Sequence, residues 1–217
     1  MLRTLKNSPY LQVALDTPDI EAAKRVISNL PESDRIILEA GTPLLKKYGC
    51  GIIPKLRQLR KDSFIVADLK TLDVGALEVG IAQESGADAA VVSGLAFPLT
   101  IRDFIQEAKR RGISSFVDMM NVADPIKALN DAGVFPDVVL LHRGIDSEVA
   151  LKHSWEYFKS IKEKLKGRSL IGIGGGIDRE LAKKSIESGA DIVIVGRYIT
   201  KAADVAAAAN SILEFIG

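Results

Sequence analysis

The stretch FIVADLKTLDVG (residues 64–75) contains residue types from which a catalytic site can be built. A run of β-branched and aromatic residues gives way to Asp68, Lys70 and Asp73, spaced Asp-x-Lys-x-x-Asp. Two carboxylates around one ammonium group can simply neutralise each other at the end of a strand. The same groups can hold a metal ion, move a proton or stabilise a developing anion. The motif alone leaves both interpretations open.

Eight short apolar runs alternate with longer segments of helical periodicity, and the motif stands at the end of one of them. The runs predict strands at residues 11–15, 35–39, 64–68, 89–93, 114–118, 137–142, 169–174 and 191–196. Amphipathic segments between them predict helices, for example at residues 19–30, 100–112, 154–167 and 179–189. The sequence SGAD precedes two strands, at 85–88 and 188–191, and indicates a recurring connection from helix to strand.

Eight strand–helix units in 217 residues predict an α/β fold, a (β/α)8 TIM barrel that forms a single domain of residues 1–217. An open, doubly wound sheet is the alternative. Such a sheet normally has a glycine-rich turn after its first strand. The first strand here runs into Asp-Thr-Pro-Asp (16–19) instead, which favours the barrel.

Composition and net charge limit the kinds of partner that the protein is expected to bind. Hydrophobic residues make up 47% of the chain and charged residues 26%, as in ordinary globular proteins. The net charge of +1 gives no electrostatic footprint for nucleic acid or a membrane surface, and we expect neither as a partner. Cys50 is the only cysteine, which excludes an intrachain disulfide. With no signal peptide and no membrane-length apolar run, we expect a cytoplasmic protein.

In a barrel of this type, the chemistry lies at the carboxyl ends of the strands. The residues predicted at those ends include Asp16, Glu39, Asp68 with Lys70, Ser93, Asp118 and His142. One strand-end aspartate often only caps the next helix. Several like charges around one opening, however, cost free energy unless a cation or a ligand compensates them. We therefore predict that this rim is the functional site.

The last two strand ends have the features of an anion site. GIGGGID (172–178) closes the seventh strand, and VGRYI (195–199) closes the eighth. Glycines let backbone N–H groups approach an anion closely, and Arg197 adds a charged donor. The same glycines are also compatible with simple tight turns. Because the loops after strands 7 and 8 commonly bind phosphate in such barrels, we predict a small phosphorylated substrate.

Seven segments together point to one enzyme family: LQVALDTPD, EAGTPLLKKYG, ADLKTLDVG, VDMMNVADP, LLHRGID, GGGID and DIVIVGRYIT. From about Leu11 to Ala203 the chain resembles the 3-hexulose-6-phosphate synthases, which belong to the orotidine monophosphate decarboxylase suprafamily of (β/α)8 barrels. The orotidine decarboxylases usually carry a lysine where this chain has Glu39, which argues against their activity.

The resemblance implies an aldol reaction that joins formaldehyde to ribulose 5-phosphate through a metal-stabilised enediolate, or runs in reverse. It also implies the site roles: Mg²⁺ (or Mn²⁺) held by Glu39 and Asp68, proton transfer by His142, stabilisation of the enediolate by Lys70, orientation of sugar hydroxyls by Asp16 and Asp118, and phosphate binding by Gly175, Gly176, Gly196 and Arg197. Asp73 would reach into the partner's active site in a homodimer, so the active sites would be shared.

Two other functions stay open. The 3-keto-L-gulonate-6-phosphate decarboxylases share the glutamate and the Asp-x-Lys-x-x-Asp motif, but they have a glutamate where Asp118 stands and an arginine where Ile145 stands. Arg143 departs from the His-Thr-Gly of many synthases and leaves the substrate preference open. The second of these other functions is a barrel that binds a phosphorylated ligand without catalysis. The intact set of charged rim residues disfavours it.

Overall fold

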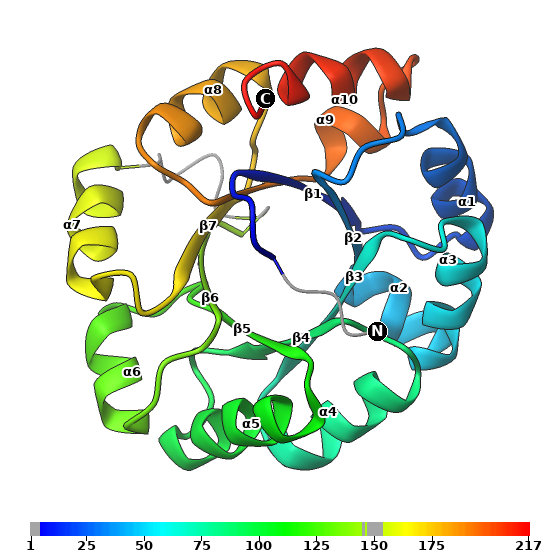
Figure 1. Ribbon diagram of the computed structural model, residues 1–217. Coiled ribbons are helices and arrows are strands. Elements are labelled where there is room, and N and C mark those ends of the chain that lie inside the picture. The colour runs from blue at the N-terminus through cyan, green and yellow to red at the C-terminus, as the bar shows by residue number, and fades with distance from the viewer. Residues whose placement is uncertain (1–4, 145, 147–153) are drawn as a thin grey trace.

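A computed structural model describes residues 5–144, 146 and 154–217, and its eight strands form a closed parallel barrel in chain order. Figure 1 looks along the barrel, with the strands as an inner ring and the helices outside it. The ring closes because β1 pairs with β8, with Tyr10 opposite Ile192, and this closure excludes the open sheet. The strands are β1 (Tyr10–Leu15), β2 (Ile36–Ala40), β3 (Phe64–Thr71), β4 (Ala89–Ser93), β5 (Ser114–Asp118), β6 (Val138–His142), β7 (Leu170–Gly174) and β8 (Ile192–Val195).

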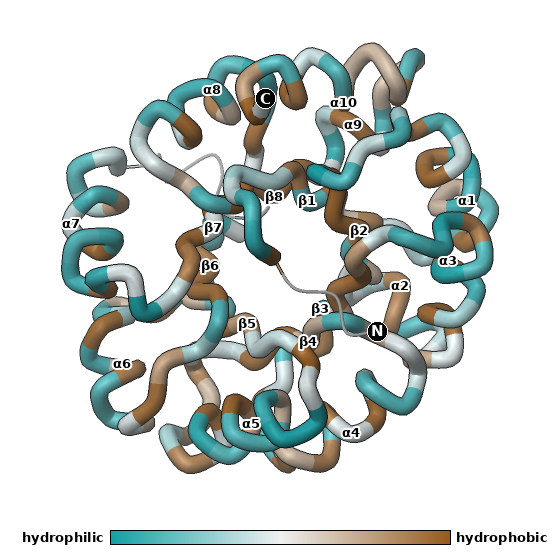
Figure 2. Tube along the Cα trace, in the orientation of Figure 1, coloured by the Kyte–Doolittle hydropathy of each residue, from teal (hydrophilic) through white to brown (hydrophobic). Residues whose placement is uncertain are grey.

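The helices occupy the outside of the ring. They are α1 (Ile20–Asn29), α2 (Thr42–Tyr48), α3 (Ile53–Leu59), α4 (Gly75–Glu84), α5 (Pro98–Arg111), α6 (Pro125–Ala132), α7 (Trp155–Leu165), α8 (Arg179–Glu187), α9 (Arg197–Thr200) and α10 (Val205–Leu213), with a 3₁₀ turn at Cys50–Ile52. Figure 2 shows hydrophobic residues along the strands and mixed hydropathy along the helices. Within the ranges that the structure describes, no helix has both the length and the apolarity to cross a membrane.

The barrel interior follows the period of two that strands impose on their side chains. Phe64 and Val66 of β3, Phe116 of β5, and Val138 and Leu140 of β6 belong to one buried cluster inside the ring. Leu5, before β1, packs against the same cluster. A larger buried cluster includes side chains of both strands and helices, such as Leu38 of β2 and Phe104 of α5. The next inward-facing residue of each strand, two positions further along, therefore lies directly above this apolar layer.

Strand β3 departs from the expected pattern. We predicted that it ends at Asp68, but it continues to Thr71. Its register with β4 shifts between Ala67 and Thr71, as at a β-bulge, and Lys70 has a positive φ of 46°. A left-handed backbone is uncommon for a residue other than glycine, and bulges often re-aim a side chain beside a site. The other seven predicted strands agree with the structure to within one residue at each end.

Candidate active site

A cavity that is open to solvent lies among the carboxyl ends of the strands, with about 310 Å³ of empty space that includes part of the solvent at its mouth. Its polar lining is supplied by Glu39, Asp68, Lys70, Asp118 and His142, and its apolar lining includes Val91, Leu140 and Ile194. The strand period explains this arrangement, because Glu39, Asp68, Asp118 and His142 each come two residues after an inward-facing apolar residue. The apolar floor and the polar mouth are therefore successive layers of the same strands.

A chain of ion pairs crosses the cavity from β3 to β6. The Lys70 ammonium donates to Asp68 Oδ2 and to Asp118 Oδ2, each at 2.8 Å. Asp118 Oδ2 also contacts His142 Nδ1 at 2.8 Å, and Asp118 Oδ1 accepts the Met120 N–H at 2.8 Å. Sequence alone placed these residues on one rim. The structure adds that Asp118 links the lysine to the histidine.

The electrostatic environment keeps the Lys70 ammonium and the Asp118 carboxylate of this ion-pair network charged. Burial alone would lower the pKa of the Lys70 ammonium, but the carboxylates of Asp68 and Asp118 outweigh it and raise that pKa. Burial would likewise raise the pKa of Asp118, yet the hydrogen bond and charge of His142, together with Lys70, hold it well below its ordinary value. Lys70 is therefore a fixed cation, and Asp118 is a fixed anion at neutral pH.

Glu39 is in a different situation. It is buried inside the barrel, and its Oε2 accepts a hydrogen bond of 2.5 Å from the amide of the fully buried Gln12. Burial raises the pKa of Glu39 well above its ordinary value, and the charges of Asp68 and Asp16 raise it further. The hydrogen bond from Gln12 and the charge of Lys70 oppose this shift only in part. The charge of Lys70 therefore does not offset the burial of Glu39 and the repulsion from its neighbouring carboxylates.

Asp16 stands at the rim beside the loops after β2 and β8. It is exposed to solvent, yet desolvation within the barrel mouth and the charge of Asp68 raise the pKa of its carboxyl. A Cβ on Gly41 would lie 2.2 Å from Asp16 Oδ1, so only glycine leaves room for this carboxylate. A Cβ on Gly196 would lie 3.8 Å from Asp16 Oδ2. Asp16 therefore faces the region between the metal-ligand candidates and the predicted phosphate loop.

The four predicted phosphate-binding residues lie after β7 and β8, outside the lining of the cavity itself. Gly175 and Gly176 have positive φ values of 95° and 65°, and Gly196 precedes α9, where the exposed Arg197 is the first residue. Close packing also requires Gly175, because a Cβ there would lie 1.9 Å from the Arg143 carbonyl oxygen. The Arg143 guanidinium donates to the Gly175 carbonyl at 3.0 Å and joins the loops after β6 and β7.

Asp73 is the one predicted catalytic residue that the structure places away from the cavity. It is exposed in the loop between β3 and α4, next to Val74, which has a positive φ of 49°. Asp73 is not among the residues that line the cavity in the described part of the chain, and its predicted role in a partner's site stays a prediction. Ile145, which stands where the resemblance predicts an arginine in the decarboxylases, lies outside the described residues.

The sequence analysis did not identify two polar residues of the site, Gln12 and Thr42. Gln12 lies on the inner face of β1 beneath Glu39, and Thr42 at the start of α2 donates to Asp68 Oδ2 at 2.7 Å and to the Asp68 carbonyl at 2.9 Å. The signal for Gln12 was available, since it is a polar residue at an inward position between Tyr10 and Ala14. Thr42 resembles an ordinary helix-start residue and gave no such signal.

Comparisons with known proteins identify a family and several relatives to which this chain is similar. Residues 9–212 match the family described as orotidine 5'-phosphate decarboxylase / HUMPS. The "Bifunctional enzyme Fae/Hps" of Archaeoglobus fulgidus is 48% identical over 216 residues, which cover 98% of this chain and 54% of that protein. The protein of the same name from Methanocella arvoryzae is 46% identical over 212 residues, which cover 97% of this chain and 54% of that protein. The chain therefore spans about half the length of these curated relatives.

Solved structures give the same result along the whole barrel. A crystal structure of 3-hexulose-6-phosphate synthase has 30% sequence identity and a TM-score of 0.85, and the match covers 96% of this chain and all of that one, 100%. The 3-hexulose-6-phosphate synthase from Salmonella typhimurium has 32% identity and a TM-score of 0.86, over 95% of this chain and 97% of its own. By its sequence and its barrel, the chain belongs to the orotidine 5'-phosphate decarboxylase / HUMPS family.

Proposed function

We propose that the chain is an aldehyde-lyase that condenses formaldehyde with D-ribulose 5-phosphate to D-arabino-3-hexulose 6-phosphate, and that the reaction is reversible. The observation that carries this proposal is the cavity in which Glu39 and Asp68 face His142 across the Lys70–Asp118 link. The names of the relatives and of the similar solved structures support it.

The chain's own residues account for the proton movements. His142 takes a proton from C1 of the pentulose phosphate, and the electron pair of that C–H bond forms the enediolate. The Lys70 ammonium, fixed by Asp68 and Asp118, stabilises the negative charge that develops. C1 then attacks the carbonyl carbon of formaldehyde, and the protonated His142 returns its proton to the formaldehyde oxygen. All atoms of both substrates remain in the hexulose phosphate.

The carboxylates of Glu39 and Asp68 fit a hard divalent cation. Among the residues that the structure describes, no three His, Cys, Asp or Glu side chains form a complete metal cage. Mg²⁺, however, is commonly held by one or two carboxylates, with water and substrate oxygens at its other positions. Burial raises the pKa of Glu39, the charges of Asp68 and Asp16 raise it further, and a cation beside these carboxylates would oppose both effects. Bound Mg²⁺ or Mn²⁺ would polarise the pentulose carbonyl and acidify the C1 proton.

Substrate orientation is the role proposed for the remaining rim residues. Asp16, beside the phosphate loop, would accept hydrogen bonds from sugar hydroxyls, and Asp118 borders the same cavity. The backbone of Gly175, Gly176 and Gly196 would donate to the phosphate, with Arg197 as the charged contact.

A homodimer with shared active sites is part of the proposal. The surface around Asp73 supports it, because it is rich in exposed apolar side chains: Leu72, Val74, Leu77, Ile81, Leu95, Phe97 and Leu99. Leu77 is 62% exposed and Phe97 68% exposed, and α4 packs against α5, so these residues lie on neighbouring elements. Large apolar side chains that are exposed on neighbouring elements favour an interaction site in a globular protein. A second copy on this surface would bring Asp73 toward its partner's cavity.

The cellular setting follows from the proposed chemistry. The reaction belongs to the ribulose monophosphate pathway, where it either fixes formaldehyde or, in reverse, supplies pentose phosphate. A cytoplasmic location suits these metabolites and the lone thiol of Cys50. Both directions use the same site, so neither is favoured by the residues that form it.

The test is the consumption of ribulose 5-phosphate on addition of formaldehyde, measured with Mg²⁺ and again with EDTA. The proposal predicts loss of the pentulose that requires formaldehyde, stops in EDTA and resumes with Mg²⁺ or Mn²⁺. Release of carbon dioxide from 3-keto-L-gulonate 6-phosphate without the aldol reaction would favour the decarboxylase instead. Binding of ribulose 5-phosphate without turnover of either substrate would favour a non-catalytic sensor.

A further inference from the structure

Asp118 makes more contacts with other protein groups than a rim residue needs if it only binds a substrate. It is only 2% exposed, and both of its oxygens are engaged: Oδ1 by the Met120 N–H, and Oδ2 by Lys70 and His142. A carboxylate with these partners is held in one orientation by strands β3, β5 and β6 together. Such a group can set the geometry of its neighbours more readily than it can follow a substrate.

The contact with His142 determines which ring nitrogen carries the proton. An ionised carboxylate only accepts hydrogen bonds, so the 2.8 Å contact requires a hydrogen on Nδ1. In the neutral imidazole this leaves Nε2 unprotonated, and Nε2 is the nitrogen that remains for a ligand in the cavity that His142 lines. Asp16 also interacts with His142 through its charge, but without a hydrogen bond that would select a tautomer.

We propose that Asp118 is a positioning residue that fixes His142 in the Nδ1–H tautomer and so presents Nε2 as the base. Lys70 supports this role from the other side, because its ammonium donates to Asp118 Oδ2 at 2.8 Å and, as an adjacent positive charge, favours the ionised carboxylate, which cannot donate. The inference deepens the proposed function and rests on it for the identity of the base. The tautomer itself is a property of the resting protein and can be measured without turnover.

The first experiment is ¹⁵N NMR of histidine-labelled protein at pH 8.5, above the ordinary histidine pKa. The chain has two histidines, and His153→Gln leaves His142 as the only imidazole to be assigned. We expect a protonated Nδ1 and an unprotonated Nε2. A protonated Nε2, or an imidazole still protonated on both nitrogens, would overturn the proposal, and neither result requires a variant at position 118 to fold.

The second experiment uses Asp118→Asn, which keeps the side-chain shape but can donate from its amide to Nδ1. We expect the hydrogen to move to Nε2, kcat to fall about 10²- to 10⁴-fold and KM to change only a few-fold. Asp88→Asn is the matched control, because Asp88 precedes the neighbouring strand β4 at the opposite end of the barrel and contacts Ile65 and Arg57.

The outcomes separate this inference from the proposed function. An Asp118→Asn protein that keeps the Nδ1–H tautomer, or that keeps full kcat after the tautomer changes, would overturn the positioning role. If the wild type and the variant show the two expected tautomers but the wild type has no aldol activity, the positioning role stands and the proposed function fails. A tautomer change in the Asp88→Asn control would show that the effect is not specific to Asp118 and would overturn the inference.

Discussion

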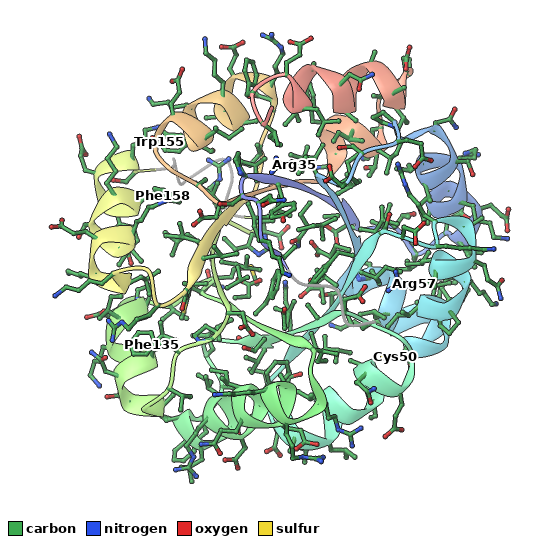
Figure 3. The ribbon with its side chains drawn as sticks, in the orientation of Figure 1. Arg35, Cys50, Arg57, Phe135, Trp155 and Phe158 are labelled. Carbon is green, nitrogen blue, oxygen red and sulfur yellow. The ribbon has the colours of Figure 1, made fainter. Side chains whose placement is uncertain are left out.

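The two ends of the barrel carry carboxylates at comparable strand positions, yet their environments are opposite. At the amino ends, Asp88, Asp137 and Asp191 stand just before β4, β6 and β8, and each accepts the N–H of the second residue of the preceding strand, at 2.8, 2.8 and 2.9 Å. Arg57, labelled in Figure 3, pairs with Asp88 in addition. At the carboxyl ends, burial and mutual repulsion raise the pKa values of Asp16 and Glu39.

The backbone strengthens the contrast. The carbonyls of Asp88, Asp137 and Asp191 accept the first N–H of β5, β7 and β1, at 2.9, 2.8 and 2.9 Å, so each aspartate joins three strands. These carboxylates are satisfied by the protein itself and stabilise the ring. At the other end, Lys70 pairs with Asp68 and Asp118, but the raised pKa values of Asp16 and Glu39 show that burial and repulsion outweigh the positive charge near those two carboxyls. In barrels of this type, the difference separates an end that maintains the fold from an end that performs chemistry.

Removal of the cation at the carboxyl end has the largest expected effect on stability. Lys70→Met would leave Asp68 and Asp118 close together without their shared ammonium, and the free energy of unfolding should fall by about 3 kcal/mol. Urea denaturation measures this change. Lys162→Met is the control, because Lys162 is 42% exposed and lies 3.8 Å from Asp191, so its loss should cost less than about 1 kcal/mol. Equal losses in the two variants would contradict the comparison.

Removal of a carboxylate at the amino end should cost stability without touching catalysis. Asp88→Ala would leave the Ile65 N–H and the Arg57 guanidinium without this acceptor, and we expect a loss of about 2 kcal/mol. Thermal denaturation and the aldol assay, run on the same preparation, check this prediction. A variant of unchanged stability but reduced turnover would reverse the roles that we assign to the two ends.

Removal of a carboxylate at the carboxyl end should have a small effect of opposite sign. Because the pKa of Glu39 is raised in the folded chain, the metal-free protein loses stability as pH rises from the unfolded pKa through the folded one. Glu39→Gln should therefore increase stability at pH 7 by on the order of 1 kcal/mol and flatten its pH dependence between the ordinary glutamate pKa and neutral pH. Melting curves in EDTA across this range test it. A destabilised variant at pH 7 would contradict the prediction.

The sequence predicted the positions of the strands well because buried parallel strands are short apolar runs bounded by clear turns. The inward direction of Asp68 and His142 then follows from the period of two. What it could not predict depends on contacts across strands: the bulge that extends β3 and turns Lys70 back between two carboxylates, and the pairing of Gln12 with Glu39. The repeated SGAD sequence was recognised as a connection, but only the closed ring shows that its aspartate joins three strands.

One paired measurement tests the division between the two ends most directly: aldol turnover and melting temperature of Asp68→Asn and Asp88→Asn, each against the wild type. We predict that Asp68→Asn loses at least about 10²-fold in turnover. Its melting temperature should change little, because Lys70 keeps Asp118 and the repulsion on Glu39 is relieved. Asp88→Asn should keep its turnover and melt several degrees lower. Full turnover in Asp68→Asn, or loss of turnover in a stable Asp88→Asn, would contradict the assignment of chemistry to the carboxyl end.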